Sequence, residues 1–167
     1  LRRPPEKPPP LDARDVDDVI VGCVSQAGDQ GANIARNAVL AAGWPIEVSG
    51  VSLNRFCGSG VQAVNFGAMG VASGTMDLVV AGGVESMSRV PMGSDGGAWP
   101  TDPAVAMPMY FVPQGISADL IATKYRISRD DVDAYAVESQ NRAQAALDAG
   151  YFQKPILPGK DQHGIDS

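Results

Sequence analysis

Residues 51–60, VSLNRFCGSG, join an apolar run to a segment of small residues through a turn that contains a cysteine. The apolar run at residues 48–53 predicts a strand, and residues 60–73 predict a helix that begins almost at once. Cys57 would then lie near the positive end of the helix dipole, where a thiolate is favoured. The two glycines that follow it leave the backbone room to bend and leave space for a substrate to approach.

A less specific interpretation of Cys57 is that it is a small buried apolar residue, as most unpaired cysteines are. The strand, Cys-Gly-Ser-Gly turn and helix around it favour a reactive thiol instead. We therefore take Cys57 as the candidate nucleophile of the chain.

The composition indicates a soluble globular domain and excludes some classes of partner. The chain has 167 residues, 44% hydrophobic and 19% charged, which is enough for a core. Its net charge of -6 argues against a nucleic-acid surface. No apolar run is long enough for a membrane span and no secretory signal is visible. Its two cysteines suggest thiols of a reducing compartment, so we expect a cytoplasmic protein, or one of an organelle matrix if a transit peptide precedes residue 1.

The first half of the chain alternates strand and helix patterns. Residues 19–24 and 78–81 predict strands on either side of the segment described above, and residues 33–42 predict a helix that ends at Gly43. This order is typical of a mostly parallel sheet covered by helices. In the helix at 60–73, one face carries larger apolar residues and the others small ones, so we expect burial on several sides. The first face is marked by Val61, Val64, Ala68 and Val71.

Three segments are expected along the chain. Residues 1–11 form a Pro-rich irregular end, residues 12–88 an α/β core, and residues 89–167 a partial lid or loop region with helices. Residues 89–113 hold five prolines and no stable period. Such a stretch is usually a lid or binding loop, and a loop that packs onto its own domain is the alternative.

Two helices are predicted in the last segment. Ser117 is placed to cap a helix at residues 118–125. Ser128 is placed to cap a longer helix at 129–149, with Asp131 at the capping-box position and Gly150 at its end.

Two motifs at this separation resemble a known family. NRFCGSG at 54–60 and VAGGVESMS at 80–88 are similar to the N-terminal half of a thiolase, an acetyl-CoA C-acyltransferase or acetyl-CoA acetyltransferase. Residues 114–118 and the helix at 128–150 are similar to the lid region of that family, and the resemblance covers about residues 12–160. It implies a duplicated α/β fold, in which this half would contribute a mixed sheet, a buried central helix and part of the lid/loop domain.

The resemblance also implies a chemistry. Cys57 would attack a thioester or 3-ketoacyl carbonyl and carry the acyl group, and its N–H would help to hold the oxyanion. Gln114 and Ser117 would bind substrate near the acyl pocket. The activity would be thiolysis of 3-ketoacyl-CoA or Claisen condensation of acetyl-CoA, in fatty acid metabolism, with coenzyme A and acyl-CoA as substrates. No permanently bound cofactor, metal or membrane is expected, and the family implies a homodimer or homotetramer.

The family's activating His and second catalytic Cys belong to its second half. His163 lies in a polar tail and is most simply a solvated turn residue, whereas Cys23 is most simply a core residue. The isolated 167-residue chain is therefore expected to be inactive. An alternative is a catalytically silent truncated paralogue that acts by pairing with another thiolase subunit.

Other candidates have two interpretations each. Gly82 and Gly83 could form a phosphate cradle, but a tight turn is favoured because no Lys follows. Glu85 could be an acid/base group, and a polar anchor for that turn is favoured. Met107 and Met109 fit an acyl pocket or simple core filling equally well.

Overall fold

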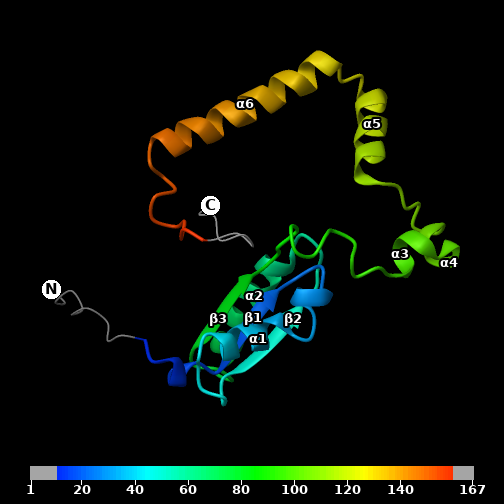
Figure 1. The fold of residues 1–167 in the computed structure, drawn as a ribbon. Coiled ribbons are helices and arrows are strands. Elements are labelled where there is room, and N and C mark those ends of the chain that lie inside the picture. Colours follow the sequence, from blue (N-terminus) through cyan, green and yellow to red (C-terminus); the bar gives the residue numbers. More distant parts are fainter. Residues whose placement is uncertain (1–10, 160–167) are drawn as a thin grey trace. The chain divides into compact units, whose positions relative to one another are not determined.

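The computed structural model describes residues 11–159 (Figure 1). It divides into two compact units, Leu1–Ala98 and Trp99–Ser167, each of which is described by itself. The Pro-rich residues 1–10 and His163 lie outside the described residues. The prediction that a lid region begins at residue 89 stays a prediction, although Val90 is buried in the first unit and Arg89 pairs with Asp29 there at 3.1 Å.

A parallel sheet forms the centre of the first unit. Its strands are β1 (Asp18–Gly22), β2 (Ser49–Leu53) and β3 (Val79–Gly83), in the order β2-β1-β3. Both pairings are parallel and in step, so that Gly22 lies level with Leu53 and with Gly83. The α/β class is thus confirmed, and over residues 11–159 the sheet expected to be mixed is parallel.

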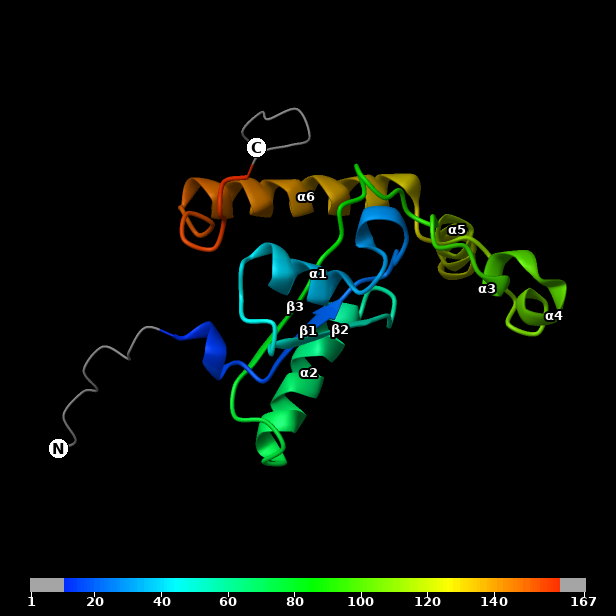
Figure 2. The same ribbon diagram turned by 60° about the horizontal axis from the view of Figure 1, so that its bottom comes forward.

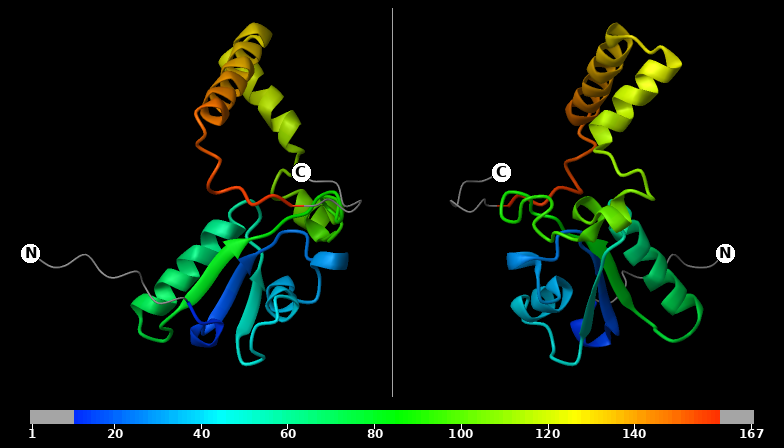
Figure 3. Two further views of the ribbon diagram at one scale, coloured as in Figure 1. Left: turned by 60° about the vertical axis from the view of Figure 1, so that its left-hand side comes forward. Right: turned by 90° about the vertical axis from the view of Figure 1, so that its right-hand side faces the viewer.

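Helices cover both faces of this sheet, as Figure 3 shows. Helix α1 (Ile34–Ala41) lies on one face, and α2 (Ser59–Ala72) lies on the other. Gly43, with φ +70°, follows α1 at the predicted position. The core under α1 is made of valines from four segments, namely Val16, Val19, Val39 and Val48. Short 3-10 helices, η1 (Ala13–Asp15) and η2 (Gly28–Gln30), flank β1.

The face of α2 that packs on the sheet is the one with the smallest side chains. Ser59, Ala63 and Gly67 are its buried residues. A Cβ added at Gly67 would lie 3.2 Å from Val79 Cγ1, so the helix and β3 approach closely. The valines on the other side of α2 are exposed in this chain, with Val61 69% and Val64 51% exposed. Within this chain α2 is therefore buried on the side that faces the sheet.

The second unit is helical within the described residues. The short helix α3 (Ala98–Thr101) stands at its beginning. It is followed along the chain by α4 (Pro103–Ala106), α5 (Gln114–Tyr125) and α6 (Arg129–Asp148). Trp99 and Phe111 pack edge to face, with ring centroids 4.5 Å apart. Helix α6 runs as one uninterrupted helix in Figure 2.

The helix starts in this unit differ in how well they were predicted. At α6, Ser128 and Asp131 form the predicted capping box, and Gly150 follows its end with φ +75°. At α5 the predicted cap is wrong, because the helix begins at Gln114 with Pro113 at the N-cap. Ser117 lies one turn inside, where its N–H donates to Pro113 O at 3.2 Å.

Candidate active site

Cys57 lies between the end of β2 and the start of α2, and its side chain is exposed. Because all three strands are parallel and in register, their carboxyl ends meet at this edge of the sheet. Open α/β sheets bind their ligands at this edge. The fold therefore presents the thiol where a ligand would be expected, beside the N-terminus of a 14-residue helix.

The turn before Cys57 is held by short hydrogen bonds. Phe56 has φ +46°, a left-handed conformation that residues other than glycine adopt at a cost. Asn54 Oδ1 accepts the N–H of Phe56 at 2.8 Å. Ser59 Oγ accepts the N–H of Arg55 at 2.8 Å and donates to Phe56 O at 2.6 Å. Side chains on both sides of the turn thus fix the backbone that carries the thiol.

Three glycines let the start of α2 lie directly on the strand ends. A Cβ at Gly22 would lie 2.3 Å from the carbonyl carbon of Ser59 and 2.5 Å from Gly60 N. A Cβ at Gly83 would lie 3.3 Å from Gly22 O and 3.4 Å from Gly60 Cα. Gly82 and Gly83 are part of β3, so the tight turn favoured for them is wrong, and the role of Gly83 is close packing.

Glu85 ties the ends of β1 and β3 together. Its carboxylate accepts the N–H of Val24 at 2.9 Å and the N–H of Ser25 at 3.1 Å. Desolvation raises the pKa of the Glu85 carboxyl, but these hydrogen bonds and one from Gln30 outweigh it and hold the pKa below its ordinary value. The interpretation of Glu85 as a polar anchor is therefore favoured by its contacts.

Gln30 was not singled out from the sequence, and it is the buried polar residue that completes this anchor. Its side chain is 4% exposed. Its Nε2 donates to Glu85 Oε1 at 2.7 Å and to Ser25 O at 2.9 Å, and its Oε1 accepts the N–H of Ser86 at 2.6 Å. A glutamine in a polar loop carries no sequence signal for such a role, because its partners Glu85 and Ser86 lie 55 and 56 positions away.

Cys23 is a core residue, as predicted, with 1% of its surface exposed. Burial raises the pKa of the Cys23 thiol, and the Glu85 carboxylate adds to this effect. Gln30 Nε2 lies 3.6 Å from its sulfur. The two cysteines of the chain thus differ sharply, because Cys23 is buried with a raised pKa whereas Cys57 is exposed.

The residues predicted to bind substrate lie in the second unit. Gln114 is exposed and Ser117 is half-buried, both in the first turns of α5. Their role in binding is untested and stays a prediction. Met107 and Met109 are 73% and 59% exposed, so neither fills a core within this chain.

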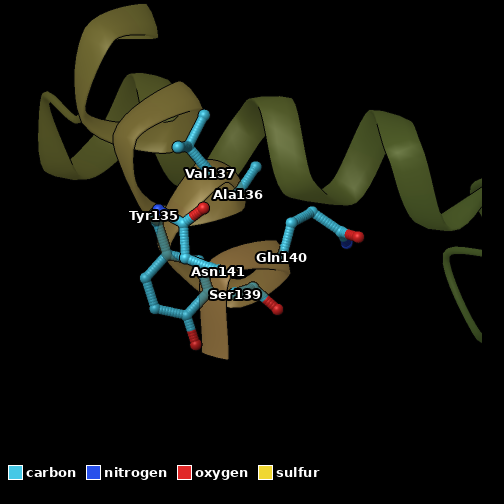
Figure 4. A pocket seen from close by; sticks show the side chains of 6 residues that line it. All are labelled: Tyr135, Ala136, Val137, Ser139, Gln140 and Asn141. Atoms are coloured by element: carbon cyan, nitrogen blue, oxygen red, sulfur yellow. The ribbon is translucent and has the colours of Figure 1, made fainter. Parts of the chain in front are cut away.

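A surface hollow on α6 is drawn in Figure 4. A single helix supplies its lining, namely Tyr135, Ala136, Val137, Ser139, Gln140 and Asn141. It holds no cysteine, histidine or charged side chain, and nothing in it indicates a reaction.

The described part of the chain shows neither a metal-binding cluster nor a membrane-spanning helix. Within residues 11–159, no three His, Cys, Asp or Glu side chains are grouped so that they could hold a metal ion. No helix in the same range has the length and apolar character needed to cross a membrane.

Comparison with known proteins gives consistent matches. The model of the thiolase N-terminal domain matches residues 6–165. The chain is 42% identical to a steroid 3-ketoacyl-CoA thiolase of Mycobacterium tuberculosis and 40% identical to a beta-ketoadipyl-CoA thiolase of Pseudomonas aeruginosa. Each alignment covers 92% of this chain, which spans 40% and 42% of the lengths of these relatives.

A solved structure agrees with these matches. The acetyl-CoA acetyltransferase of Bacillus anthracis matches with a TM-score of 0.75 at 33% identity. The match covers 93% of this chain and 43% of that one.

Proposed function

Because the chain belongs to the thiolase family, we propose that Cys57 is the nucleophile of an acyltransferase that works on coenzyme A thioesters. The observation that carries this proposal is the placement of Cys57, exposed directly after the left-handed Phe56 at the carboxyl ends of the strands of a parallel sheet. The chain spans about two fifths of the length of these relatives, so the activity is proposed for the protein that contains this chain.

The proposed reaction is the thiolysis of a 3-ketoacyl-CoA or its reverse. The thiolate of Cys57 attacks the C3 carbonyl, the bond between C2 and C3 breaks, and the acetyl-CoA carbanion takes up a proton and leaves. The acyl group stays on Sγ as a thioester, which the thiol of coenzyme A then attacks to give a shorter acyl-CoA. One difficult carbon–carbon step is thereby divided into two easier ones.

The residues described here would serve the first half of this reaction. Cys57 would supply the sulfur, and its backbone N–H at the start of α2 is a candidate donor to the developing oxyanion. The stretch of chain from residue 11 to residue 159 contains no histidine. We therefore place the base that accepts the thiol proton outside these residues.

Two further predictions concern the surroundings of the thiol. We propose that residues from about 89 onward contribute to a lid over coenzyme A, and that Gln114 and Ser117 contact the acyl chain.

A third prediction concerns location and assembly. We propose a cytoplasmic protein that forms homodimers or homotetramers. The edge positions of β2 and β3 within the described sheet support self-association, since an unpaired strand edge favours a partner.

Substitution of the two cysteines tests the proposal. In the protein that contains this chain, Cys57→Ser is expected to lower the thiolysis of acetoacetyl-CoA by about 10³-fold or more, because the covalent route is lost. The matched control is Cys23→Ser, which removes the other thiol of this chain and should leave turnover within an order of magnitude. A Cys57→Ser protein that is as active as the control would refute the assignment.

A further inference from the structure

The turn at residues 54–59, here called the nucleophile turn, is linked by hydrogen bonds to residues far from it in the chain. Glu85, Val24 and Asn54 form a continuous series of hydrogen bonds that ends at the backbone of Phe56, next to Cys57. We propose that Glu85 and Asn54 are positioning residues for Cys57, linked through the backbone of Val24. The proposal rests on the proposed role of Cys57 as the nucleophile.

The series begins at Glu85. Its two carboxylate oxygens take the N–H groups of Val24 and Ser25 separately, which fixes the direction of the chain as it leaves β1. Gln30 holds the carboxylate from the other side and also accepts the N–H of Ser86. Because Ser25 and Gln30 are 3% and 4% exposed, this part of the loop is firmly packed.

Asn54 connects that loop to the nucleophile turn. Its Nδ2 donates to Val24 O at 3.1 Å, and its Oδ1 accepts the N–H of Phe56 at 2.8 Å. Both ends of the amide are therefore used, one on each segment. Glu85 holds the N–H of the same residue, Val24, whose carbonyl orients Asn54.

The turn needs such support because Phe56 is left-handed, with φ +46°. A residue with a Cβ persists in this conformation only where its surroundings hold it. A small change in the φ of Phe56 moves the next residue, which is Cys57. Displacement of a reacting group by about 1 Å can cost on the order of 10²-fold in rate.

The chain offers a matched control at the opposite ends of the same strands, where β1 and β3 begin. Asp17 accepts the N–H groups of Asp77 and Leu78 at 2.6 and 3.1 Å. Like Glu85, it joins β1 to β3 through two backbone donors, but it does so before the strands begin. Its loss should weaken the sheet without reaching the Cys57 turn.

The experiment compares five variants of the protein that contains this chain, namely Asn54→Ala, Asn54→Ser, Glu85→Gln, Asp17→Asn and Cys57→Ser. Acetoacetyl-CoA thiolysis gives kcat and KM, and thermal unfolding by circular dichroism gives stability. We expect kcat to fall about 10- to 100-fold in Asn54→Ala and Glu85→Gln, with KM changed by less than about threefold. Asn54→Ser, which restores a weaker acceptor for the N–H of Phe56, should recover part of the loss. Asp17→Asn should keep the wild-type kcat.

A double variant tests whether Asn54 and Glu85 act through one path. The kcat of the double variant Asn54→Ala with Glu85→Gln should lie within about twofold of the kcat of the slower single variant, because both substitutions act on the same turn. Full multiplication of the two losses would contradict the link through Val24. If Glu85→Gln does not fold, the comparison of Asn54→Ala with Asn54→Ser decides, and equal wild-type values of kcat in both overturn the proposal.

The outcome for Cys57→Ser separates this proposal from the one it rests on. If Cys57→Ser remains active, the proposed function fails. If Cys57→Ser is inactive while the Asn54 and Glu85 variants keep the wild-type kcat, as Asp17→Asn should, Cys57 is still the nucleophile and the proposed positioning role is wrong.

Discussion

At Gly22 the backbone of β1 passes so close to the first turn of α2 that a single methyl group has no place. The nearest atoms to an added Cβ belong to the backbone of Ser59 and Gly60, at 2.3 to 2.5 Å, and backbone atoms cannot rotate away. Glycine is needed here for space, because the φ of Gly22 is not among the positive values. The height of the Cys57 turn above the sheet depends on this contact.

Gly22→Ala is therefore expected to destabilise the fold by about 3 kcal/mol or more, which is at the upper end of the cost of overpacking. Gly82→Ala is the matched control, since nothing lies within 4 Å of a Cβ there. It should change the free energy of unfolding by less than about 1 kcal/mol. Urea denaturation of both variants measures the difference, and equal stabilities would contradict the close approach.

Asp17 gives a prediction about pH. The N–H of Asp77, and next the N–H of Leu78, hold the pKa of the Asp17 carboxyl below its ordinary value of 3.8. A lowered folded-state pKa means that the carboxylate stabilises the fold fully above the ordinary value, and that this contribution is lost as the pH falls through the folded-state pKa. The stability gap between wild type and Asp17→Asn should thus be constant near neutral pH and shrink below about pH 4. Urea midpoints measured across that range check it, and a gap that widens in acid would contradict the hydrogen bonds.

Among the elements, α2 shows what periodicity leaves open. Its apolar and small residues predicted burial on several sides without saying which side meets the sheet, and the side that does is the row of Ser59, Ala63 and Gly67. The side chains on β3 stand so close to Gly67 that a bulky helix face does not fit. The length and the limits of α2 followed from the sequence, whereas the face that packs depends on a distance to the sheet that periodicity does not contain.

The N-terminus of α6 behaves as local chemistry predicts. Ser128 Oγ accepts the N–H of Asp131 at 3.1 Å, and Asp131 accepts the N–H of Ser128 at 3.0 Å. The Ser128 hydroxyl, and next its N–H, lower the pKa of the Asp131 carboxyl. Because these contacts are three residues apart, the sequence was enough to predict them.

Ser128→Ala is expected to weaken α6 by about 1 kcal/mol, which is the usual cost of a lost N-cap. The helicity of a peptide that spans residues 126–150, measured by circular dichroism, should fall. Ser139→Ala is the control, because Ser139 is an exposed interior residue of the same helix and alanine is a better helix former. If Ser128→Ala raised the helicity of the peptide as Ser139→Ala does, a stabilising role of Ser128 as the N-cap would be excluded.

At the scale of the whole molecule, the sequence predicted the elements better than the contacts between them. The strand and helix order, which is typical of a mostly parallel sheet, and the position of Cys57 before α2 followed from residues close in sequence. The hydrogen bonds that Glu85 accepts from Val24 and Ser25 span 61 and 60 positions, and the one that Gln30 accepts from Ser86 spans 56. These contacts of Glu85 and Gln30 depend on how β1 and β3 pair, and that pairing becomes visible only in the folded chain.

The difference between the two cysteines allows a direct measurement on the whole molecule. Cleavage after Arg residues places Cys23 in a peptide of residues 15–36 and Cys57 in a peptide of residues 56–89. The acyl group should be found on the second peptide, since Cys57 is exposed and Cys23 is buried.

The most direct test is to mix the protein that contains this chain with acetyl-CoA, quench it with acid and map the peptides by mass spectrometry. We predict an acetyl thioester on the peptide of residues 56–89, lost when coenzyme A is added before the quench and absent in Cys57→Ser. An acetyl group on the Cys23 peptide, or no acetylated peptide although the protein turns over, would contradict the role of Cys57 as the nucleophile.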